Sequence, residues 1–279
     1  MQPVLALALL AVLRASPEAL LDAGLASHPA GAARAVWATR AFLGARYLSS
    51  PLGEEAPPDQ GPRFRLDAFD CTTLVETAIA LGNAGSVAEA RALLDDIRYD
   101  GPPSFAHRNH YVLAEWLPAN RRKGWIEEVT SEIAGDRARR VELRYTTASW
   151  RSAARSGHLL PHLDPALLPT GAFAFSIVPL AAMKAIASAI PEGTLVAVVR
   201  TARPDRPYRV THLGLVVVRQ GVVVVRHASP ARMRVVDEPL ERFIARASAS
   251  SGWKVEGLSL WAIRSNPARA RELKGPRGE

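Results

Sequence analysis

The valine-rich stretch over residues 212–227 constrains the fold of this chain most strongly. Val216, Val217 and Val218 are followed by a short turn with Gly221 and by a second valine run. Two β-branched runs around a Gly-containing turn predict a β-hairpin. The β-rich runs of the second half cover residues 195–200, 212–218, 222–227, 233–236 and 258–263. We therefore expect an antiparallel sheet in this half of the chain.

Apolar residues spaced three and four positions apart predict helices in the first half. Ser86 and Glu89 form a capping-box pattern, which marks a helix start. The predicted helices cover residues 30–47, 72–81 and 86–97, with a shorter one over 181–190, while residues 125–150 favour no single assignment. Helices followed by strands predict an α+β fold, here a single domain over residues 29–265 followed by a polar tail over 266–279.

The charge and the single cysteine limit the function classes. The sequence has 35 basic and 27 acidic residues, a net charge of +8, which favours a polyanionic partner. Nucleic acid is not the expected one, because no Lys/Arg run interleaved with aromatic residues occurs in the sequence. One cysteine excludes an internal disulfide and a cysteine-based zinc site. No apolar run reaches the roughly 18 residues of a transmembrane helix.

Residues 1–13 form an apolar run with the length of a signal-peptide core. No Lys or Arg precedes the run, and no small-x-small cleavage site follows it. Residues 1–28 are therefore interpreted as a signal peptide or as an ordinary N-terminal helix, and a misassigned start codon is a third reading. A signal peptide predicts a periplasmic or secreted protein; its absence leaves the cytoplasm.

Cys71 lies at or just before the start of the helix predicted over residues 72–81. Unpaired N–H groups and the helix dipole favour negative charge at such a position. We therefore expect a lowered thiol pKa and a nucleophilic thiolate. The alternative is a buried structural cysteine, since free cysteine is among the most buried residue types.

Two histidines accompany the predicted hairpin. His212 opens its first strand and His227 closes its second, so antiparallel pairing brings them together across fifteen positions. His212 could act as base to Cys71 while His227 orients its ring. The alternative is that both histidines only cap the sheet edge.

A second histidine pair, His107 and His110, stands three residues apart. The metal-binding pattern H-E-x-x-H is absent there, so a metal is not expected. These residues are expected to line a cleft beside Cys71 or to be satisfied structural polar groups.

These segments resemble the NlpC-type cysteine peptidases, papain-like cell-wall hydrolases with a Cys-His-polar triad. Within that superfamily the chain is most similar to the N-acetylmuramoyl-L-alanine amidase-like family of unknown function. The resemblance covers residues 30–243, and only Leu74 stands where a bulkier aromatic is expected. The matching pieces are Phe42-Leu43-Gly44 with Tyr47, Phe69-Asp70-Cys71-Thr72-Thr73 with Val75-Glu76, Arg108-Asn109-His110-Tyr111 with Trp116, and residues 212–229.

The resemblance implies a papain-like fold in which the nucleophile Cys71 starts a helix packed on the sheet. It implies His212 as the base and His227 as the orienting residue, with the N–H groups of Cys71 and Thr72 as the oxyanion hole. The candidate substrate-binding residues are Asp70, Thr72, Arg108, Asn109, His110, Tyr111 and Ser229.

The implied function is thiol-dependent cleavage of an amide bond in peptidoglycan, either the muramoyl–alanine amide or a peptide bond of a D-amino acid. An acyltransferase with the same triad and a non-catalytic cell-wall-binding protein are the alternatives, and a metal amidase is least expected. We expect no cofactor, a peptidoglycan or muropeptide partner, and a monomer. Family members are usually exported, and a basic protein suits an acidic wall polymer.

Overall fold

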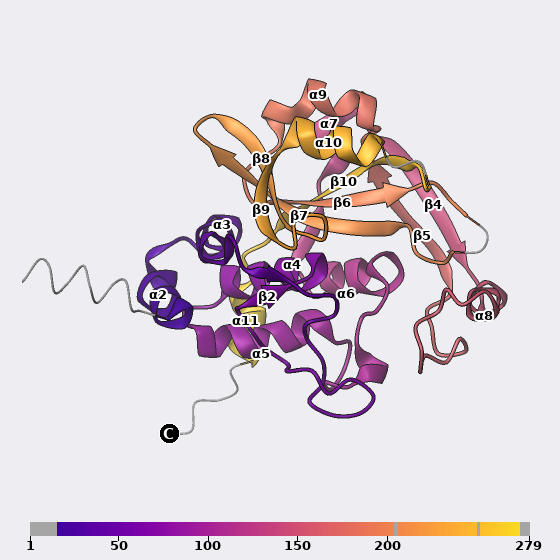
Figure 1. The fold of residues 1–279 in the computed structure, drawn as a ribbon, viewed down its shortest axis with the longest axis horizontal. Coiled ribbons are helices and arrows are strands. Elements are labelled where there is room, and N and C mark those ends of the chain that lie inside the picture. The colour runs from indigo at the N-terminus through magenta and orange to yellow at the C-terminus, as the bar shows by residue number, and fades with distance from the viewer. Residues whose placement is uncertain (1–15, 204–205, 250–251, 274–279) are drawn as a thin grey trace, which may run out of the picture.

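The computed structural model describes residues 16–203, 206–249 and 252–273, and an eight-stranded sheet runs through them (Figure 1). Its strand order is β2-β1-β9-β8-β7-β6-β10-β3. Only β1 and β2 pair in parallel; the other neighbours are antiparallel. The strands are β1 Arg46–Tyr47, β2 Ala68–Phe69, β3 Ile126–Glu128, β6 Thr194–Arg200, β7 Val210–Arg219, β8 Val222–Ser229, β9 Arg234–Pro239 and β10 Val255–Ile263. The predicted α+β fold with a mostly antiparallel sheet is confirmed.

Helices cover both faces of the sheet, which gives three layers (Figure 1). The layer on one face contains α2 Pro17–Gly24, α3 Ala32–Thr39, α4 Cys71–Asn83, α5 Val87–Arg98, α6 Leu117–Arg122 and α11 Pro267–Leu273. The other face packs against α7 Thr130–Ala134, α9 Met183–Ile186 and α10 Leu240–Ser248. Alternate residues of β7 and β8 serve the two cores, because successive side chains of a strand point to opposite faces.

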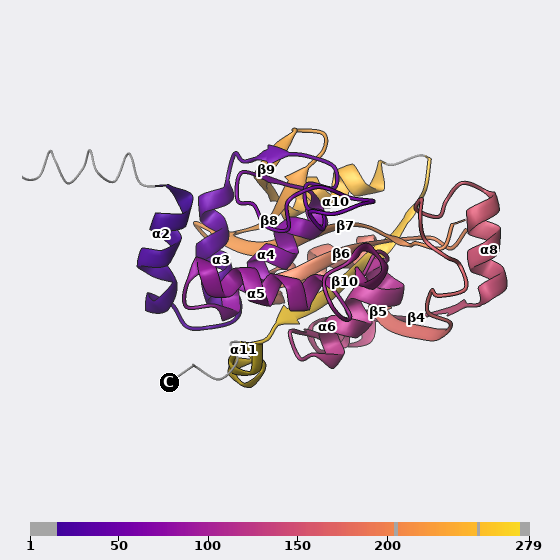
Figure 2. The same cartoon turned by 90° about the horizontal axis from the view of Figure 1, so that it is seen from below.

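A smaller two-stranded sheet extends one end of the molecule (Figure 2). It consists of β4 Arg139–Tyr145 and β5 Gly171–Ile177, and α8 Thr147–Arg155 follows β4. Tyr145 stacks on Trp150 of α8 at 4.8 Å between ring centroids, in a separate small core. Residues 125–150 follow no single periodicity because the strands and helices there are short and alternate in type.

Helix α4 is the centre of the first layer. It packs against α3 and α5 of its own layer and against β7 and β8 of the sheet. Thr73 to Gly82 are all buried, including Leu74, Ala78 and Leu81, so the helix predicted over 72–81 is confirmed. Helix α5 begins after Ser86, whose hydroxyl accepts a hydrogen bond from the Glu89 N–H, as the capping pattern predicts.

The helix predicted over residues 30–47 is too long. Helix α3 ends at Thr39, and a short 3₁₀ turn, Arg40–Phe42, follows. Gly44 then adopts φ +85°, which suits glycine and not a helix interior. The chain continues into β1, so Tyr47 lies in a strand.

The two end segments, residues 1–28 and 266–279, each contain a helix. Residues 267–273 form α11. Within this helix Ala270 is buried, and Arg269 forms an ion pair with Asp96 at 2.6 Å. The polar tail expected over 266–279 therefore contains a docked helix. At the other end, α2 lies inside residues 1–28, while the apolar run over 1–13 is outside the described residues. Among the described residues, no helix is long and apolar enough to cross a membrane.

Candidate active site

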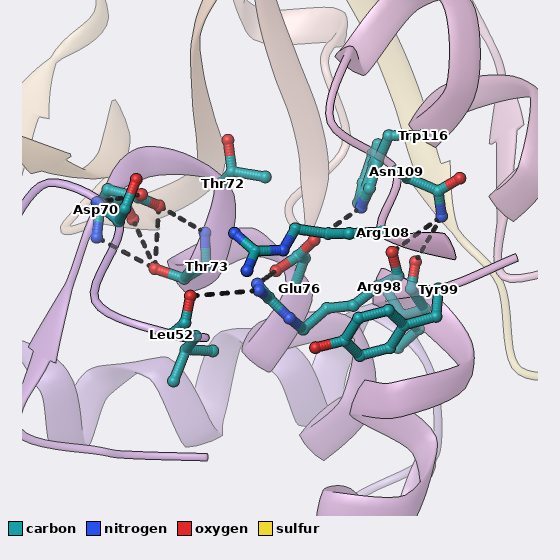
Figure 3. A network of polar contacts seen from close by, with 12 residues as sticks. Leu52, Asp70, Thr72, Thr73, Glu76, Arg98, Tyr99, Arg108, Asn109 and Trp116 are labelled. Carbon is teal, nitrogen blue, oxygen red and sulfur yellow. Dashed lines mark hydrogen bonds and ion pairs between the residues drawn. The ribbon is translucent and has the colours of Figure 1, made fainter. Parts of the chain in front are cut away.

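Cys71 is the first residue of α4, where the sequence predicts it. Asp70 is the N-cap: its Oδ1 accepts a hydrogen bond from the Thr73 N–H at 2.8 Å, and the Thr73 hydroxyl accepts one from the Asp70 N–H at 3.0 Å (Figure 3). This reciprocal pair fixes the helix start. It leaves the N–H groups of Cys71 and Thr72, which have no carbonyl one turn earlier in the helix to bond.

Cys71 opens onto a cleft of about 470 Å³. His212, on β7, lies in the wall of the same cleft, and the next residue, Leu213, directs a backbone hydrogen bond to the Cys71 sulfur. The lining residues are Cys71, Thr72, His110, Tyr111, Val112, Gly157, His158, Leu159, Leu160, Pro161, Tyr208, Val210, Thr211, His212 and Leu213. The helix start and the first strand of the hairpin therefore meet at one cleft.

The two hairpin histidines are in direct contact. His212 Nε2 lies 2.8 Å from His227 Nδ1, a hydrogen-bond distance, and the rings are nearly perpendicular. Gly214 permits this approach, because a Cβ there would come within 3.3 Å of His227 Cβ and 2.5 Å of Val225 Cγ1. His227 is fully buried, whereas His212 is partly exposed to the cleft. The predicted neighbourhood of the two histidines is confirmed.

The side chain of Glu238, which the sequence analysis does not single out, extends the line of hydrogen-bonded side chains that His212 and His227 begin. Glu238 Oε2, on β9, lies 3.1 Å from His227 Nε2 and accepts a hydrogen bond of 2.7 Å from Arg246 of α10. The strand predicted over 233–236 ends before Glu238, whereas β9 continues to Pro239. Extending the alternation of β9 by two residues would have placed Glu238 on the face of Val236.

The surroundings of Cys71 and His212 favour the neutral form of each side chain. Burial, then the negative charge of Asp70, raises the pKa of the Cys71 thiol to about 11, against a smaller opposite effect of the Leu213 hydrogen bond. Burial, then repulsion by a protonated His227 and by the charge of Arg246, lowers the pKa of His212 to about 3. The lowered thiol pKa expected from the helix N-terminus is therefore wrong, because loss of solvation outweighs the helix dipole.

Burial, with Arg246 nearby, also lowers the pKa of His227 to about 4, against the opposing effect of Glu238. Both imidazoles of the pair are thus neutral at pH 7. A neutral imidazole has one donor and one acceptor nitrogen, so each ring can donate one hydrogen bond and accept another.

The candidate substrate-binding residues fall into two groups. Thr72, His110 and Tyr111 line the cleft, and the Tyr111 hydroxyl accepts a hydrogen bond from the Leu160 N–H at 3.3 Å. Asp70 acts as the helix cap, and Ser229 is buried with its hydroxyl accepting from the Arg232 N–H.

Arg108 and Asn109 make structural contacts, and Figure 3 shows those of Asn109. Arg108 pairs with Glu54 at 2.7 Å and with Asp59 at 2.8 Å, which holds the loop over 51–62. The Asn109 amide donates to the Arg98 carbonyl at 3.0 Å. Neither residue is among the described residues that line the cleft.

His107 and His110 form hydrogen bonds with different partners. The His107 ring lies 2.7 Å from Ser104 Oγ, and the His110 ring lies 2.7 Å from the Phe105 carbonyl oxygen. Within residues 16–203, 206–249 and 252–273, no cluster of three or more metal-binding side chains is present. The chemistry that the cleft offers is that of a thiol, a neutral imidazole pair and helix-start N–H groups.

The fold has solved relatives. A crystal structure of a protein from Legionella pneumophila is similar with a TM-score of 0.71 and 23% identity, over 84% of this chain and 89% of that one. Two crystal structures of an N-acetylmuramoyl-L-alanine amidase from Bacteroides uniformis match with TM-scores of 0.65 and 0.62 at 20% and 21% identity, over 83% of this chain and 98% of each of theirs. No curated protein sequence matches the chain.

The sequence itself matches a family profile. The profile, described as AmiA-like and N-acetylmuramoyl-L-alanine amidase-like, covers residues 37–250, which include Cys71, His212, His227 and Glu238. The match spans more than half of the chain and holds the whole cleft. This protein belongs to the N-acetylmuramoyl-L-alanine amidase-like family.

Proposed function

We propose that this protein is a cysteine-dependent cell-wall hydrolase that cleaves an amide bond of peptidoglycan, with Cys71 as nucleophile, His212 as base and His227 as the orienting residue. The carrying observation is the His212–His227 hydrogen bond at 2.8 Å, in the wall of the cleft onto which Cys71 opens. A thiol and an imidazole at one cleft, with a second side chain hydrogen-bonded to that imidazole, suit the nucleophile, base and orienting group of a papain-like enzyme, and we place the chain with the NlpC-type members of that group.

The reaction begins with a proton on sulfur. Because His212 Nε2 is engaged with His227, His212 Nδ1 is the nitrogen left to accept the thiol proton. The sulfur attacks the amide carbonyl as this proton leaves, and the N–H groups of Cys71 and Thr72 stabilise the oxyanion. The C–N bond then breaks, and the His212 proton passes to the departing amine.

The second half restores the enzyme. The acyl group is held as a thioester on Cys71. Water attacks the thioester carbonyl while His212 accepts a proton from it, and the C–S bond breaks. The carboxylic acid leaves, and the proton returns from His212 to sulfur. Acyl transfer to an amine differs only in the nucleophile of this step.

The substrate assignment is supported by the family and by the surface charge. The family name describes cleavage of the muramoyl–alanine amide, and the Bacteroides uniformis neighbours carry the same name. A net charge of +8 favours binding to a polymer that carries carboxylates and phosphates. We propose a periplasmic or secreted protein, since peptidoglycan lies outside the cytoplasmic membrane.

Digestion of purified peptidoglycan tests this function. The released fragments are identified by mass spectrometry, with and without a chelator and with and without an added primary amine. We expect cleavage that resists the chelator and leaves water-derived carboxylic acids. A folded sample that cleaves nothing contradicts the function, and cleavage abolished by the chelator contradicts the thiol mechanism. Fragments carrying the added amine in place of the acid indicate an acyltransferase.

A further inference from the structure

Glu238, His227 and His212 form a continuous polar row across three neighbouring strands. His227 pairs with Val236 and Val225 pairs with Glu238 in the β8–β9 register, so His227 and Glu238 lie on the same face of the sheet, one step apart along the strands. The distances along the row are 3.1 Å from Glu238 Oε2 to His227 Nε2 and 2.8 Å from His227 Nδ1 to His212 Nε2. Phe243 of α10 packs against both rings.

Glu238 can only accept hydrogen bonds. Burial alone would raise the pKa of this carboxyl, but the hydrogen bond and charge of Arg246, together with His227, hold the pKa below its usual value. An ionised carboxylate has no proton to donate. His227 must therefore donate from Nε2, which leaves Nδ1 of its neutral ring without a proton.

The same reasoning fixes the second ring. A His227 Nδ1 without a proton accepts, so His212 must donate from Nε2. A neutral His212 that carries its proton on Nε2 has a free lone pair on Nδ1, which is the nitrogen left for the thiol proton. The hydrogen-bond partner of one ring nitrogen generally determines which nitrogen is protonated. Here Glu238 determines the tautomer of His227, and His227 in turn determines the tautomer of His212.

We propose that Glu238 is a positioning residue that sets the tautomers of both histidines, and so keeps His212 Nδ1 available as the proton acceptor. The catalytic consequence rests on the proposed function of Cys71 and His212. The tautomer assignment itself does not, because it is a property of the folded protein and can be measured without substrate.

The test is ¹⁵N NMR of protein labelled at its seven histidines, recorded near pH 7, with His212→Gln and His227→Gln spectra to assign the two rings. In the wild type we expect both rings with a protonated Nε2 and an unprotonated Nδ1. In Glu238→Ala the opposite tautomer should appear in both rings together, since their hydrogen bond couples them. Glu238→Gln keeps the shape and a weaker acceptor, so it should show a smaller change of the same kind. Glu241→Ala removes an exposed carboxylate nearby and should leave both rings unchanged.

Kinetics provide a second measurement. We expect kcat to fall at least ~10-fold in Glu238→Ala with little change in KM, and Glu238→Gln to recover part of it. A protonated Nδ1 in either ring of the wild type overturns the assignment. Unchanged tautomers in both Glu238 variants also overturn it, and Glu238→Gln provides this outcome even where the alanine variant does not fold. A wild type with the expected tautomers but without cleavage contradicts the proposed function alone.

Discussion

At the scale of single residues, Cys71 and His212 have opposite pKa shifts with the same effect. The thiol pKa is raised to about 11 and the His212 pKa is lowered to about 3, in both cases mainly by burial. Both shifts favour the neutral thiol and imidazole over the thiolate and imidazolium. In the proposed reaction the proton therefore moves during the attack on the substrate and not before it.

Alkylation of Cys71 tests this resting state, and it has a simple readout because the chain has one cysteine. Since the thiolate is the reactive form, the rate with iodoacetamide should be low at pH 7 and rise about tenfold per pH unit toward pH 11. The rate is measured by intact-protein mass spectrometry, with free cysteine as the control. A fast rate that stays level between pH 5 and 8 would instead indicate a thiolate–imidazolium pair.

At the scale of the elements, a buried ion pair holds α4 against α5. Glu76 of α4 and Arg98 of α5 are both almost fully buried, with Arg98 Nη1 2.6 Å from Glu76 Oε2 (Figure 3). Trp116 Nε1 donates to the other carboxylate oxygen at 3.0 Å. Glu76 follows Cys71 by five residues on the same helix, so this cluster anchors the helix that presents the thiol.

We expect Arg98→Met to lower the free energy of unfolding by about 3–5 kcal/mol, because it leaves the Glu76 charge buried and unpaired. Glu76→Leu should cost a similar amount. The double variant should cost clearly less than the sum, since no charge remains to be paired. Chemical denaturation measures all three, with the exposed Arg122→Ala as the control, whose cost should stay below ~1 kcal/mol. Additive costs would show that the two side chains do not depend on each other.

The elements near the site also indicate what a sequence can predict. The hairpin and the α4 start were predictable because each has a local signal: two valine runs around Gly221, and an apolar helical repeat after Asp70. Glu238 was not, because its role depends on which strand lies beside β8 and in which register. Arg108 and Asn109 share a conspicuous local motif with His110, yet only His110 lines the cleft, since the first two bond with residues 54, 59, 97 and 98.

At the scale of the whole molecule, buried histidines make the fold sensitive to acid. His110, His212 and His227 all have pKa values lowered mainly by burial, to about 4, 3 and 4. The unfolded chain binds these protons below about pH 6.5, whereas the folded protein does not until about pH 4 or lower. The stability that these residues contribute is therefore present above pH 6.5 and is lost as the pH falls from 6.5 toward 4.

His110→Gln isolates one of these contributions. The glutamine amide can still donate to the Phe105 carbonyl, which His110 Nε2 contacts at 2.7 Å, but it takes up no proton. Between pH 6.5 and 4 the unfolding free energy of the variant should fall less steeply than that of the wild type, by up to ~1.4 kcal/mol per pH unit. Denaturant unfolding at a series of pH values gives both slopes. Equal slopes would mean that His110 is protonated equally in the folded and unfolded states.

The layered fold brings the parts of the candidate site together. Helix α4 packs on β7 and β8, and both the start of α4 and the first strand of the hairpin line the cleft. We propose that the thiol at this point performs the cleavage. The most direct measurement is kcat/KM on a defined muropeptide for the wild type and Cys71→Ala, with thermal unfolding as the folding control. We predict a fall of at least ~10³-fold with a nearly unchanged unfolding temperature. Equal rates in two folded proteins would remove Cys71 from the mechanism.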